Sequence, residues 1–253
     1  MLICPICKKE LSKIDNSYKC INNHSFDINK KGYTNLLLNH PNSGDNKDMV
    51  NARLTFLNKG YYNPLKEEIN KLIIDSKKEK VLDLGCGVGY YTNELKNKIY
   101  GIDISKEAII KASQNKNNLY FVASANNIPF EKNSFDIVLS IFAPIFESEI
   151  IRILNDSGLL IIVTPGIYHL IELKELLYSN PYLNNEKNQK LTGFSLFTKS
   201  ELKYQKNILK EDIINLVKMT PYFYKTNKDD LLKIQKDLSI TIDFNIEVYK
   251  KSN

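Results

Sequence analysis

Short apolar runs separated by longer mixed stretches dominate the middle of the chain. They lie at residues 80–84, 99–103, 119–122, 135–139 and 158–163, and their starts are 16 to 23 residues apart. Runs of this length that are rich in valine, isoleucine and leucine are typical of buried strands, and the intervals leave room for crossover helices. The pattern therefore predicts an α/β fold with a largely parallel, doubly wound sheet.

Segments on either side of these runs have helical or strand patterns. Residues 48–59 place apolar side chains at helical spacing and stop at Gly60, and Pro64 opens a second amphipathic helix. Residues 209–219 predict a further amphipathic helix that faces the sheet, and alternation over 240–249 predicts a late antiparallel strand.

Polar stretches divide the chain. Residues 39–48 contain proline and glycine and predict a linker. We therefore distinguish a domain at residues 1–38, a linker with helices at 39–75 and an α/β domain at 76–253. Residues 171–199 are expected to form a surface loop with a helix; a lid or a substrate-specific insertion is the alternative.

The composition narrows the classes of protein. The chain has 253 residues, of which 43% are hydrophobic and 25% charged, so it can bury a core and does not resemble a disordered chain. The longest apolar run, 159–163, is far shorter than the roughly 20 residues of a membrane span. No apolar signal region is visible at the N-terminus, and three of the four cysteines lie within the first 20 residues. We therefore expect a cytoplasmic protein with reduced thiols and no membrane partner.

Basic side chains outnumber acidic ones by 35 to 29, which gives a net charge of +6. Residues 1–80 hold 14 basic and 9 acidic side chains, whereas residues 81–253 hold 21 and 20. All the basic residues except Arg53 and Arg152 are lysines, and the chain also contains 30 asparagines. This composition is typical of an AT-rich genome, so the number of lysines alone is weak evidence for nucleic-acid binding. The confinement of the excess to the first third of the chain is more informative.

Four side chains near the N-terminus have the types and spacing of a metal site. Cys4, Cys7, Cys20 and His24 form a C-x2-C-x12-C-x3-H pattern. Each short pair points two ligands at one ion, and three thiolates with one imidazole complete a closed tetrahedral shell. The pattern predicts a structural zinc ion rather than scattered free or buried thiols. A domain of about 35 residues has too small a core to fold alone, so zinc would contribute its folding free energy.

Lysines and aromatic rings are interleaved in this predicted zinc domain. They are Lys8, Lys9, Lys13, Tyr18, Lys19, Phe26, Lys30, Lys31 and Tyr33. Cations beside rings that can stack suit a nucleic-acid surface. A solvated lysine-rich face around a small apolar core would have the same composition, so this feature alone supports both interpretations equally.

A glycine-rich turn directly follows the first apolar run. Asp83 lies near the end of the run, and glycines follow at alternate positions as Gly85, Gly87 and Gly89. This G-x-G-x-G spacing lets the chain turn sharply and bring backbone N–H groups close to a ligand. It differs from the G-x-G-x-x-G of dinucleotide sites, which makes room for a pyrophosphate. The tighter loop therefore favours a nucleoside that carries an amino acid.

The ends of the next two apolar runs bring further groups to the same edge of the sheet. Asp103 ends the second run, 20 positions after Asp83, where a carboxylate can accept both hydroxyls of a ribose. Ser124, Ala125 and Asn126 follow the third run and would border an adenine. Cys86, inside the loop, is interpreted as a small packing residue rather than a metal ligand or a nucleophile.

The loop and Asp103 resemble those of the class I S-adenosylmethionine-dependent methyltransferases. The whole chain is similar to a narrower family, the zinc-containing 23S ribosomal RNA guanine-N1 methyltransferases, and looks closer to their Gram-positive branch, which includes tylosin-resistance enzymes. The motifs that carry this resemblance are Cys4-Pro5-x-Cys7, Cys20-x3-His24-x-Phe26-Asp27, Lys31-Gly32-Tyr33-x-Asn35-Leu36-Leu37, Gly44-Asp45, Met49-Val50-x-Ala52-Arg53-x2-Phe56-Leu57, Gly60-Tyr61-Tyr62, Thr164-Pro165-Gly166-x2-His169-Leu170-x-Glu172-Leu173-Lys174, Met219-Thr220-Pro221 and Asp243-Phe244-Asn245-Ile246.

The resemblance implies a Rossmann-like domain with a mostly parallel seven-stranded sheet, joined to a small N-terminal zinc-ribbon-like domain. It implies S-adenosylmethionine as the cofactor and a structural zinc ion. The implied substrate is N1 of one guanine in a hairpin of 23S ribosomal RNA, near the macrolide-binding exit tunnel. A homodimer is implied in the same way, and the sequence does not decide whether drug resistance results.

The resemblance also assigns side chains to the cofactor site. Beyond the loop residues, Asp103 and the adenine border, it adds Tyr62, Val88, Tyr90 and His169. A single histidine is by itself more often structural. Tyr62 is expected to close over the methionyl end of the cofactor, and packing between domains is the alternative. Val88 replaces a glutamate of other members, and Phe142 replaces a tyrosine but keeps a ring beside which a flipped-out base would fit. No residue is identified as the catalytic proton acceptor for guanine N1.

Two other functions remain open. A small-molecule methyltransferase would use the same sheet and loop, because neither specifies the acceptor, although it would not need a basic zinc domain. A zinc-containing RNA-binding protein with an inactive methyltransferase domain is the third interpretation. The intact glycine loop, Asp83 and Asp103 argue against such a loss.

Overall fold

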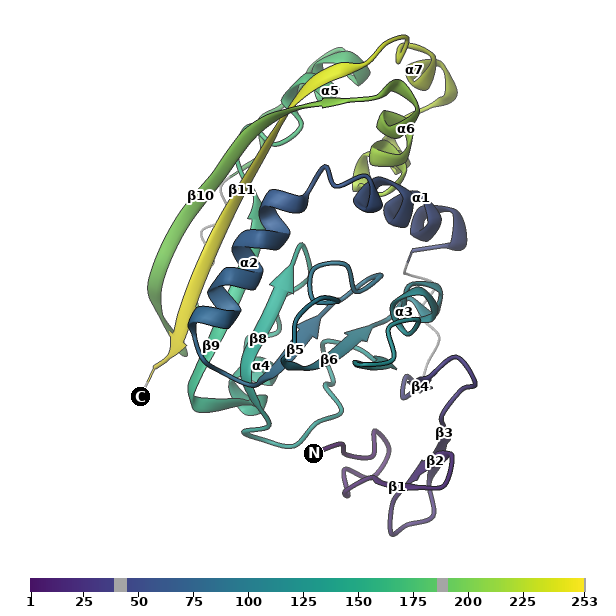
Figure 1. Ribbon diagram of the computed structural model, residues 1–253, viewed down its shortest axis with the longest axis vertical. Coiled ribbons are helices and arrows are strands. Elements are labelled where there is room, and N and C mark those ends of the chain that lie inside the picture. The colour runs from purple at the N-terminus through teal and green to yellow at the C-terminus, as the bar shows by residue number, and fades with distance from the viewer. Residues whose placement is uncertain (39–44, 186–190, 253) are drawn as a thin grey trace.

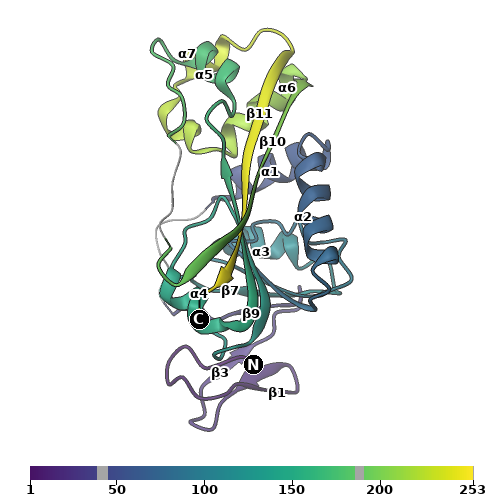
Figure 2. The ribbon, with the colours of Figure 1, turned by 90° about the vertical axis from the view of Figure 1, so that its left-hand side faces the viewer.

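The computed structural model describes residues 1–38, 45–185 and 191–252. Most of the predicted linker, residues 39–44, lies outside the described residues, as does the part of segment 171–199 at 186–190. Along the longest axis of the protein, the N-terminal domain lies at one end and the α/β sheet in the middle (Figure 1). Two long paired strands extend to the opposite end, where small helices lie, as the side view shows (Figure 2).

A mostly parallel sheet forms the centre of the protein. The described residues give it eight strands in the order β10-β11-β9-β8-β5-β6-β7-β4. The strands are β4 (Tyr33–Asn35), β5 (Lys80–Leu84), β6 (Lys98–Asp103), β7 (Leu119–Val122), β8 (Phe135–Ile141), β9 (Leu154–Pro165), β10 (Phe194–Ile208) and β11 (Leu238–Lys251). Strands β4 to β9 pair in parallel, and β11 pairs antiparallel with both β9 and β10. The predicted α/β sheet is confirmed, and all six predicted strands are present.

The N-terminal domain is joined to the α/β domain by backbone pairing. Its own small sheet consists of β1 (Ser12–Ile14), β2 (Ser17–Lys19) and β3 (Ser25–Asp27). Leu2 forms an isolated bridge with Phe130, and β4 pairs in parallel with β7. Because β4 comes from this domain, the sheet is one strand wider than the seven strands predicted. A three-residue strand is too short to leave a periodic signal in the sequence.

Helices pack on both faces of the sheet. One apolar core includes residues of α1 (Lys47–Asn58), α2 (Asn63–Asp75), α5 (Ile171–Leu177) and α6 (Lys210–Lys218). A second core joins α4 (Glu147–Ile153) and the N-terminal domain to the opposite face, and α3 (Lys106–Ala112) packs near β4 and β7. The predicted helices at 48–59, from Pro64 and at 209–219 are therefore confirmed. No helix in the described ranges is long and apolar enough to cross a membrane.

The sequence prediction was wrong for the segment before residue 199. The helix expected there is α5, but β10 begins at Phe194, where a surface loop was expected. Nearly all side chains of β10 are exposed, including Leu196 and Phe197. Because the strand has almost no buried face, its sequence lacks the alternation of apolar and polar residues that predicts a strand. The strand forms because it pairs with β11 along almost its whole length. The remaining small helices are η1 (Pro221–Lys225) and α7 (Lys228–Leu232).

Helix α2 provides a direct test of this packing. Ile69 is fully buried between α2 and the sheet, whereas Ile74 of the same helix is 61% exposed. We expect Ile69→Ala to lower the free energy of unfolding by about 2–5 kcal/mol, because it removes buried methyl groups and leaves a cavity. The matched variant Ile74→Ala should change it by less than about 0.5 kcal/mol. Urea denaturation checks both values, and equal effects would contradict the assigned face of α2.

Candidate functional site

The carboxyl ends of β5, β6 and β8 meet at the point where the sheet reverses its strand order. From β5 the chain continues to β6 on one side, and it later returns to β8 on the other side of β5. Ligands of open α/β sheets bind in the crevice at such a point. The predicted cofactor loop, Asp103 and Phe142 all lie at this edge.

Gly85, Gly87 and Gly89 turn the chain at the end of β5. Their φ angles are +72°, +53° and +75°, a region that other residues rarely adopt. A Cβ atom on Gly85 would lie 2.6 Å from the Cβ of Ala143, so the loop is tightly packed on that flank. At Gly87 the nearest atom to such a Cβ is a nitrogen of Arg53, 3.9 Å away. The loop is therefore less crowded at Gly87 than at Gly85, and the guanidinium of Arg53 lies against this part of the backbone.

Asp103 anchors this loop from the end of β6. One carboxylate oxygen accepts a hydrogen bond from the backbone N–H of Gly87 at 2.9 Å, and the other accepts one from Ser105 at 2.7 Å. Burial raises the pKa of Asp103, whereas these N–H groups and the Arg53 cation act to lower it. Each carboxylate oxygen can accept more than one hydrogen bond, so the position and chemistry of Asp103 fit the hydroxyls of a ribose.

Asp83 lies below the loop rather than at the surface of the crevice. It is 3% exposed and accepts a hydrogen bond from the Thr92 hydroxyl at 2.8 Å. Burial raises the pKa of Asp83 to about 7. Asp83 therefore supports the turn from inside the protein, and its direct contact with a cofactor stays a prediction.

Val88 and Tyr90 are buried in the core that includes α2. The Tyr90 hydroxyl donates a hydrogen bond to the side chain of Asn63 at 2.5 Å, and the Lys66 ammonium lies 4.8 Å from the centre of its ring. We therefore expect both residues to approach a cofactor through their backbone. Cys86 is buried in another small core, in keeping with its predicted packing role.

Residues 124–126 lie beside the end of β6, where the sequence predicts the border of an adenine. The backbone N–H of Ala123 donates a hydrogen bond to the carbonyl of Asp103 at 3.0 Å, which fixes the start of this loop. The side chain of Asn127, at its end, accepts a hydrogen bond from Lys8 of the N-terminal domain. The N-terminal domain therefore touches the rim of the crevice.

Phe142 follows β8 on the other side of the glycine loop. Its φ angle is +57°, which is unusual for a bulky residue, and it is 45% exposed. Its ring packs against Phe244 of β11 with a centroid distance of 5.5 Å. Strained backbone of this kind is often found at functional sites, and an exposed ring beside the loop is suited to stacking on a planar group.

Tyr62 and His169 form a buried pair that packs against Phe244, with ring centroids at 5.1 and 4.8 Å from its ring. Nδ1 of His169 accepts a hydrogen bond from the backbone N–H of Asp243 at 3.2 Å, so Nε2 carries the ring proton and faces the Tyr62 hydroxyl at 3.4 Å. Burial lowers the pKa of His169 to about 3, and Lys174 acts in the same direction. The imidazole is therefore neutral at pH 7. Both side chains are nearly inaccessible, and their contact with a cofactor stays a prediction.

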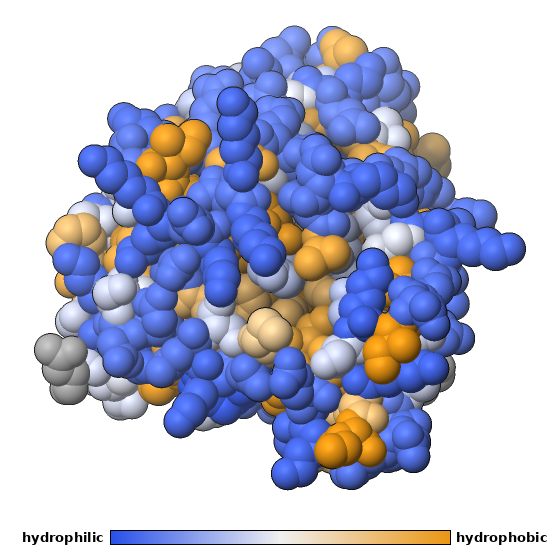
Figure 3. Space-filling view, turned by 60° about the horizontal axis from the view of Figure 1, so that its bottom comes forward, coloured by the Kyte–Doolittle hydropathy of each residue, from blue (hydrophilic) through white to orange (hydrophobic). Residues whose placement is uncertain are grey.

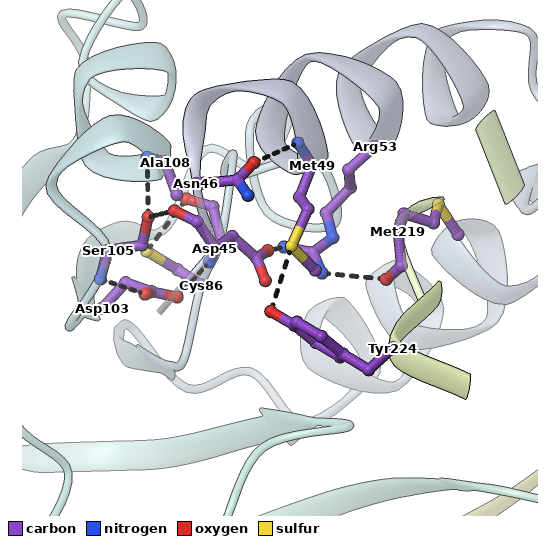
Figure 4. Close-up of polar contacts among 11 residues, drawn as sticks. Asp45, Asn46, Met49, Arg53, Cys86, Asp103, Ser105, Ala108, Met219 and Tyr224 are labelled. Atoms are coloured by element: carbon purple, nitrogen blue, oxygen red, sulfur yellow. Dashed lines mark hydrogen bonds and ion pairs between the residues drawn. The ribbon is translucent and has the colours of Figure 1, made fainter. Parts of the chain in front are cut away.

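Arg53 reaches the crevice from α1, although it was not among the predicted cofactor residues. Its Nη1 forms an ion pair with Asp45, and its Nη2 donates a hydrogen bond to the carbonyl of Met219 at 3.1 Å (Figure 4). The backbone carbonyl of Asp45 also accepts a hydrogen bond from Ser105 at 2.9 Å. Three segments far apart in the sequence thus meet above the loop. The sequence signal that could have identified Arg53 is its residue type. In a chain whose basic residues are nearly all lysines, an arginine indicates a contact that needs the planar guanidinium group.

Cys4, Cys7, Cys20 and His24 converge as predicted, with all their ligand atoms within 4.8 Å of one another. The sulfurs of Cys7 and Cys20 are 3.6 Å apart, and Nδ1 of His24 lies 3.5 Å from the Cys4 sulfur and 3.4 Å from that of Cys20. Bonds of about 2.0–2.3 Å to a tetrahedral zinc ion give edges of roughly 3.5–3.8 Å, so both the spacing and the donor set fit one zinc ion. A backbone N–H of Lys9 lowers the pKa of Cys7 to about 6, which favours the thiolate.

Comparisons with known proteins match both the α/β domain and the N-terminal domain. A family model described as a methyltransferase domain matches residues 75–230, and the model of the RlmA N-terminal zinc ribbon matches residues 2–42. A Bacillus subtilis (strain 168) protein assigned by name as a 23S rRNA (guanine-N(1)-)-methyltransferase is 33% identical, covering 99% of this chain and 97% of that protein. The 23S rRNA (guanine(748)-N(1))-methyltransferase of Streptomyces fradiae is 32% identical, covering 70% of this chain and 67% of that enzyme.

Solved structures share the fold. The PH0226 protein of Pyrococcus horikoshii OT3 aligns with a TM-score of 0.50 at 19% identity, covering 76% of this chain and 91% of that one. A structure described for the conversion of a disulfide bond into a thioacetal group during echinomycin biosynthesis gives 0.51 at 13% identity, covering 73% and 81%. The predicted class I methyltransferase fold with an N-terminal zinc ribbon is thereby confirmed.

The metal site makes a specific prediction for Cys4→Ser. Loss of one thiolate should release zinc and unfold the N-terminal domain, because the metal supplies much of the folding free energy of so small a unit. Elemental analysis should find well under one zinc per chain in this variant. The matched variant Cys86→Ser, whose cysteine lies outside the cluster, should keep its zinc. Stoichiometric zinc in Cys4→Ser would contradict the site.

His169 should make stability depend on pH under mildly acidic conditions. Its folded pKa of about 3 lies below the ordinary value of 6.5, so below pH 6.5 the unfolded chain binds a proton that the folded protein does not. The stability that the neutral imidazole contributes is complete above pH 6.5 and decreases as the pH falls toward 3. Relative to His169→Gln, the free energy of unfolding should decrease by about 2 kcal/mol between pH 7 and pH 5.

Urea unfolding of both proteins at the two pH values measures this difference. Asp83, whose raised pKa gives the opposite dependence, is present in both proteins and cancels in the comparison. A difference that stays constant between pH 7 and pH 5 would contradict the buried neutral imidazole.

Proposed function

The chain belongs to the family of 23S rRNA guanine-N1 methyltransferases that carry an RlmA-type zinc ribbon, and from this premise we propose its reaction. It transfers a methyl group from S-adenosylmethionine to N1 of a specific guanine in a hairpin of 23S ribosomal RNA. The observation that carries this proposal is the 33% identity to the Bacillus relative, because it extends over both the zinc domain and the catalytic domain.

The crevice residues fit the cofactor. Bound S-adenosylmethionine would supply an activated methyl group on a sulfonium ion. The turn at Gly85–Gly89 offers its backbone to the methionyl part, Asp103 offers a carboxylate to the ribose, and residues 124–126 border the adenine. Tyr62 and His169 are proposed to support the methionyl end from beneath the surface, since the pair lies behind Phe244.

Phe142 is proposed to hold the acceptor base. Guanine N1 lies on the pairing edge of the base, so the nucleotide must leave its helix or loop stack before transfer. The exposed ring of Phe142, beside the glycine loop, would stack on the base and align N1 with the methyl group. His169 is not the proton acceptor in this scheme, because its Nδ1 lone pair already accepts a backbone N–H and its pKa is about 3.

The zinc domain is proposed to bind the RNA. Its six lysines are all exposed, and the rings of Tyr18 and Phe26 are half-buried, whereas Tyr33 is buried and only structural. The end of the protein that carries this domain has a mostly hydrophilic surface (Figure 3). The exposed lysines of this domain suit a phosphate backbone. The proposed substrate places the enzyme in the cytoplasm, and the homodimer implied by the resemblance remains a proposal.

Two alternative functions would require different features of this chain. A small-molecule methyltransferase would use the crevice but would have no role for the exposed lysines of the zinc domain. An inactive RNA-binding protein would have no need for three positive-φ glycines and an anchored Asp103, which are all present.

Methylation of ribosomal RNA tests the proposal. Purified protein should transfer tritium from labelled S-adenosylmethionine to 23S rRNA, or to large subunits, from a strain that lacks the enzyme. Reverse transcription should then stop at one guanine, because N1-methylation blocks base pairing. No transfer to either substrate, or transfer to another atom, would overturn the proposal.

Phe142 provides the matched pair of variants for this assay. Phe142→Ala should lower kcat/KM for RNA about 10- to 100-fold, because base stacking on an aromatic ring is worth roughly 1–3 kcal/mol. Phe142→Tyr keeps the ring and should stay near the unmodified protein. Cofactor affinity should be unchanged in both variants, and equal activity of the two would remove the role given to the ring.

A further inference from the structure

Arg53 is the cation that lies above the cofactor loop, and its position has a chemical consequence if the chain binds S-adenosylmethionine as proposed. Arg53 belongs to helix α1, and one of its nitrogens is the nearest atom to a Cβ built on Gly87. Gly87 is also the residue whose N–H is held by Asp103. The guanidinium therefore lies against the least crowded glycine of the loop.

The contacts of Arg53 fix its direction. Asp45 precedes α1 and pairs with Nη1, while the carbonyl of Met219, just after α6, accepts from Nη2. Figure 4 shows the guanidinium held between these two groups, with Asp103 and Ser105 nearby on the other side of Asp45. These two contacts engage two of the five N–H donors of an arginine. The fork is thus oriented by the protein before any ligand arrives.

Charges around the crevice define what Arg53 can bind. Burial lowers the pKa of Arg53, and the charge of Asp103 acts against that shift, so the two groups interact. Asp45 and Asp103 border the crevice, so the carboxylate of a bound cofactor would lie near acidic groups. A carboxylate that loses its water on binding needs a cation or N–H groups as a partner. The planar fork of an arginine matches a carboxylate better than the ammonium of a lysine does.

We propose that Arg53 binds the α-carboxylate of the methionyl group of the cofactor and so selects ligands that carry this amino acid. Asp45 and the Met219 carbonyl are positioning groups that hold the guanidinium above Gly87. Asp103 binds the ribose, which lies between the methionyl group and the adenine of the same ligand. Recognition of the cofactor is then divided between an acidic residue at the sugar and a basic residue at the amino acid.

Two ligands that differ in the amino acid test this proposal. S-adenosylhomocysteine carries the α-carboxylate, whereas methylthioadenosine contains the same adenosine and thioether but lacks the amino acid. Isothermal titration calorimetry of the full chain measures both affinities. Arg53→Gln should weaken binding of S-adenosylhomocysteine about 10- to 100-fold, the range for a hydrogen bond between charged groups. Binding of methylthioadenosine should change less than about threefold, and Arg53→Lys should lie between the two proteins.

Arg152→Gln is the matched control. Arg152, the other arginine of the chain, also pairs with a carboxylate and with backbone carbonyls, but it lies on α4, on the opposite face of the sheet. Its loss should leave the ratio of the two affinities unchanged, so any general destabilisation is separated from ligand recognition.

The outcomes divide clearly. If Arg53 only holds α1 in place, Arg53→Gln will weaken both ligands equally, which overturns the proposal while leaving the proposed function intact. If the unmodified protein binds neither ligand, the proposed function fails and this inference fails with it. A selective loss of S-adenosylhomocysteine affinity supports the assignment of the carboxylate to Arg53.

Discussion

The carboxylate of Asp103 is the group on which the arrangement of the crevice depends. It accepts hydrogen bonds from the turn after β5 and from the residue that caps α3, so it joins the ends of two neighbouring strands. Burial raises the pKa of Asp103, whereas the backbone N–H groups of Ser105 and Gly87 act to lower it. The hydrogen bonds of Asp103 therefore hold the loop in place, and the crevice is largely formed before a ligand binds.

Elements from outside the parallel core complete this crevice. Arg53 comes from α1, its partner Asp45 from the segment before that helix, and the Met219 carbonyl from beyond α6, 166 residues away in sequence. The Tyr61 hydroxyl also donates to Asp212 of α6 at 2.8 Å, so α1, α2 and α6 are tied together close to the same point. The covering of the crevice consequently requires the C-terminal strands to be in place. A site assembled from such distant segments forms only with the complete fold.

Local patterns explain what could be predicted from the sequence. The runs that became β5 to β9 are buried on both faces, and the glycine loop and the cysteine pairs depend on spacing within a few residues. Strand β10 has almost no buried face, so its partner β11 determines it and its own sequence does not. Burial of His169 and the placement of Arg53 likewise depend on contacts with residues more than 70 positions away, which no local period encodes.

Specificity for one guanine sets a geometric requirement that the sheet and the cofactor loop cannot meet alone, because neither distinguishes one acceptor from another. In the proposed function, the zinc domain holds the RNA at a set distance from the cofactor loop. That domain is not tethered loosely, since β4 pairs with β7 and Lys8 contacts Asn127 at the rim of the crevice. Its exposed lysines are therefore fixed relative to Phe142. The excess of positive charge in the first 80 residues then has a structural meaning. RNA bound to the zinc domain can bring to the Phe142 ring only a base that lies at the matching distance from the bound part of the RNA.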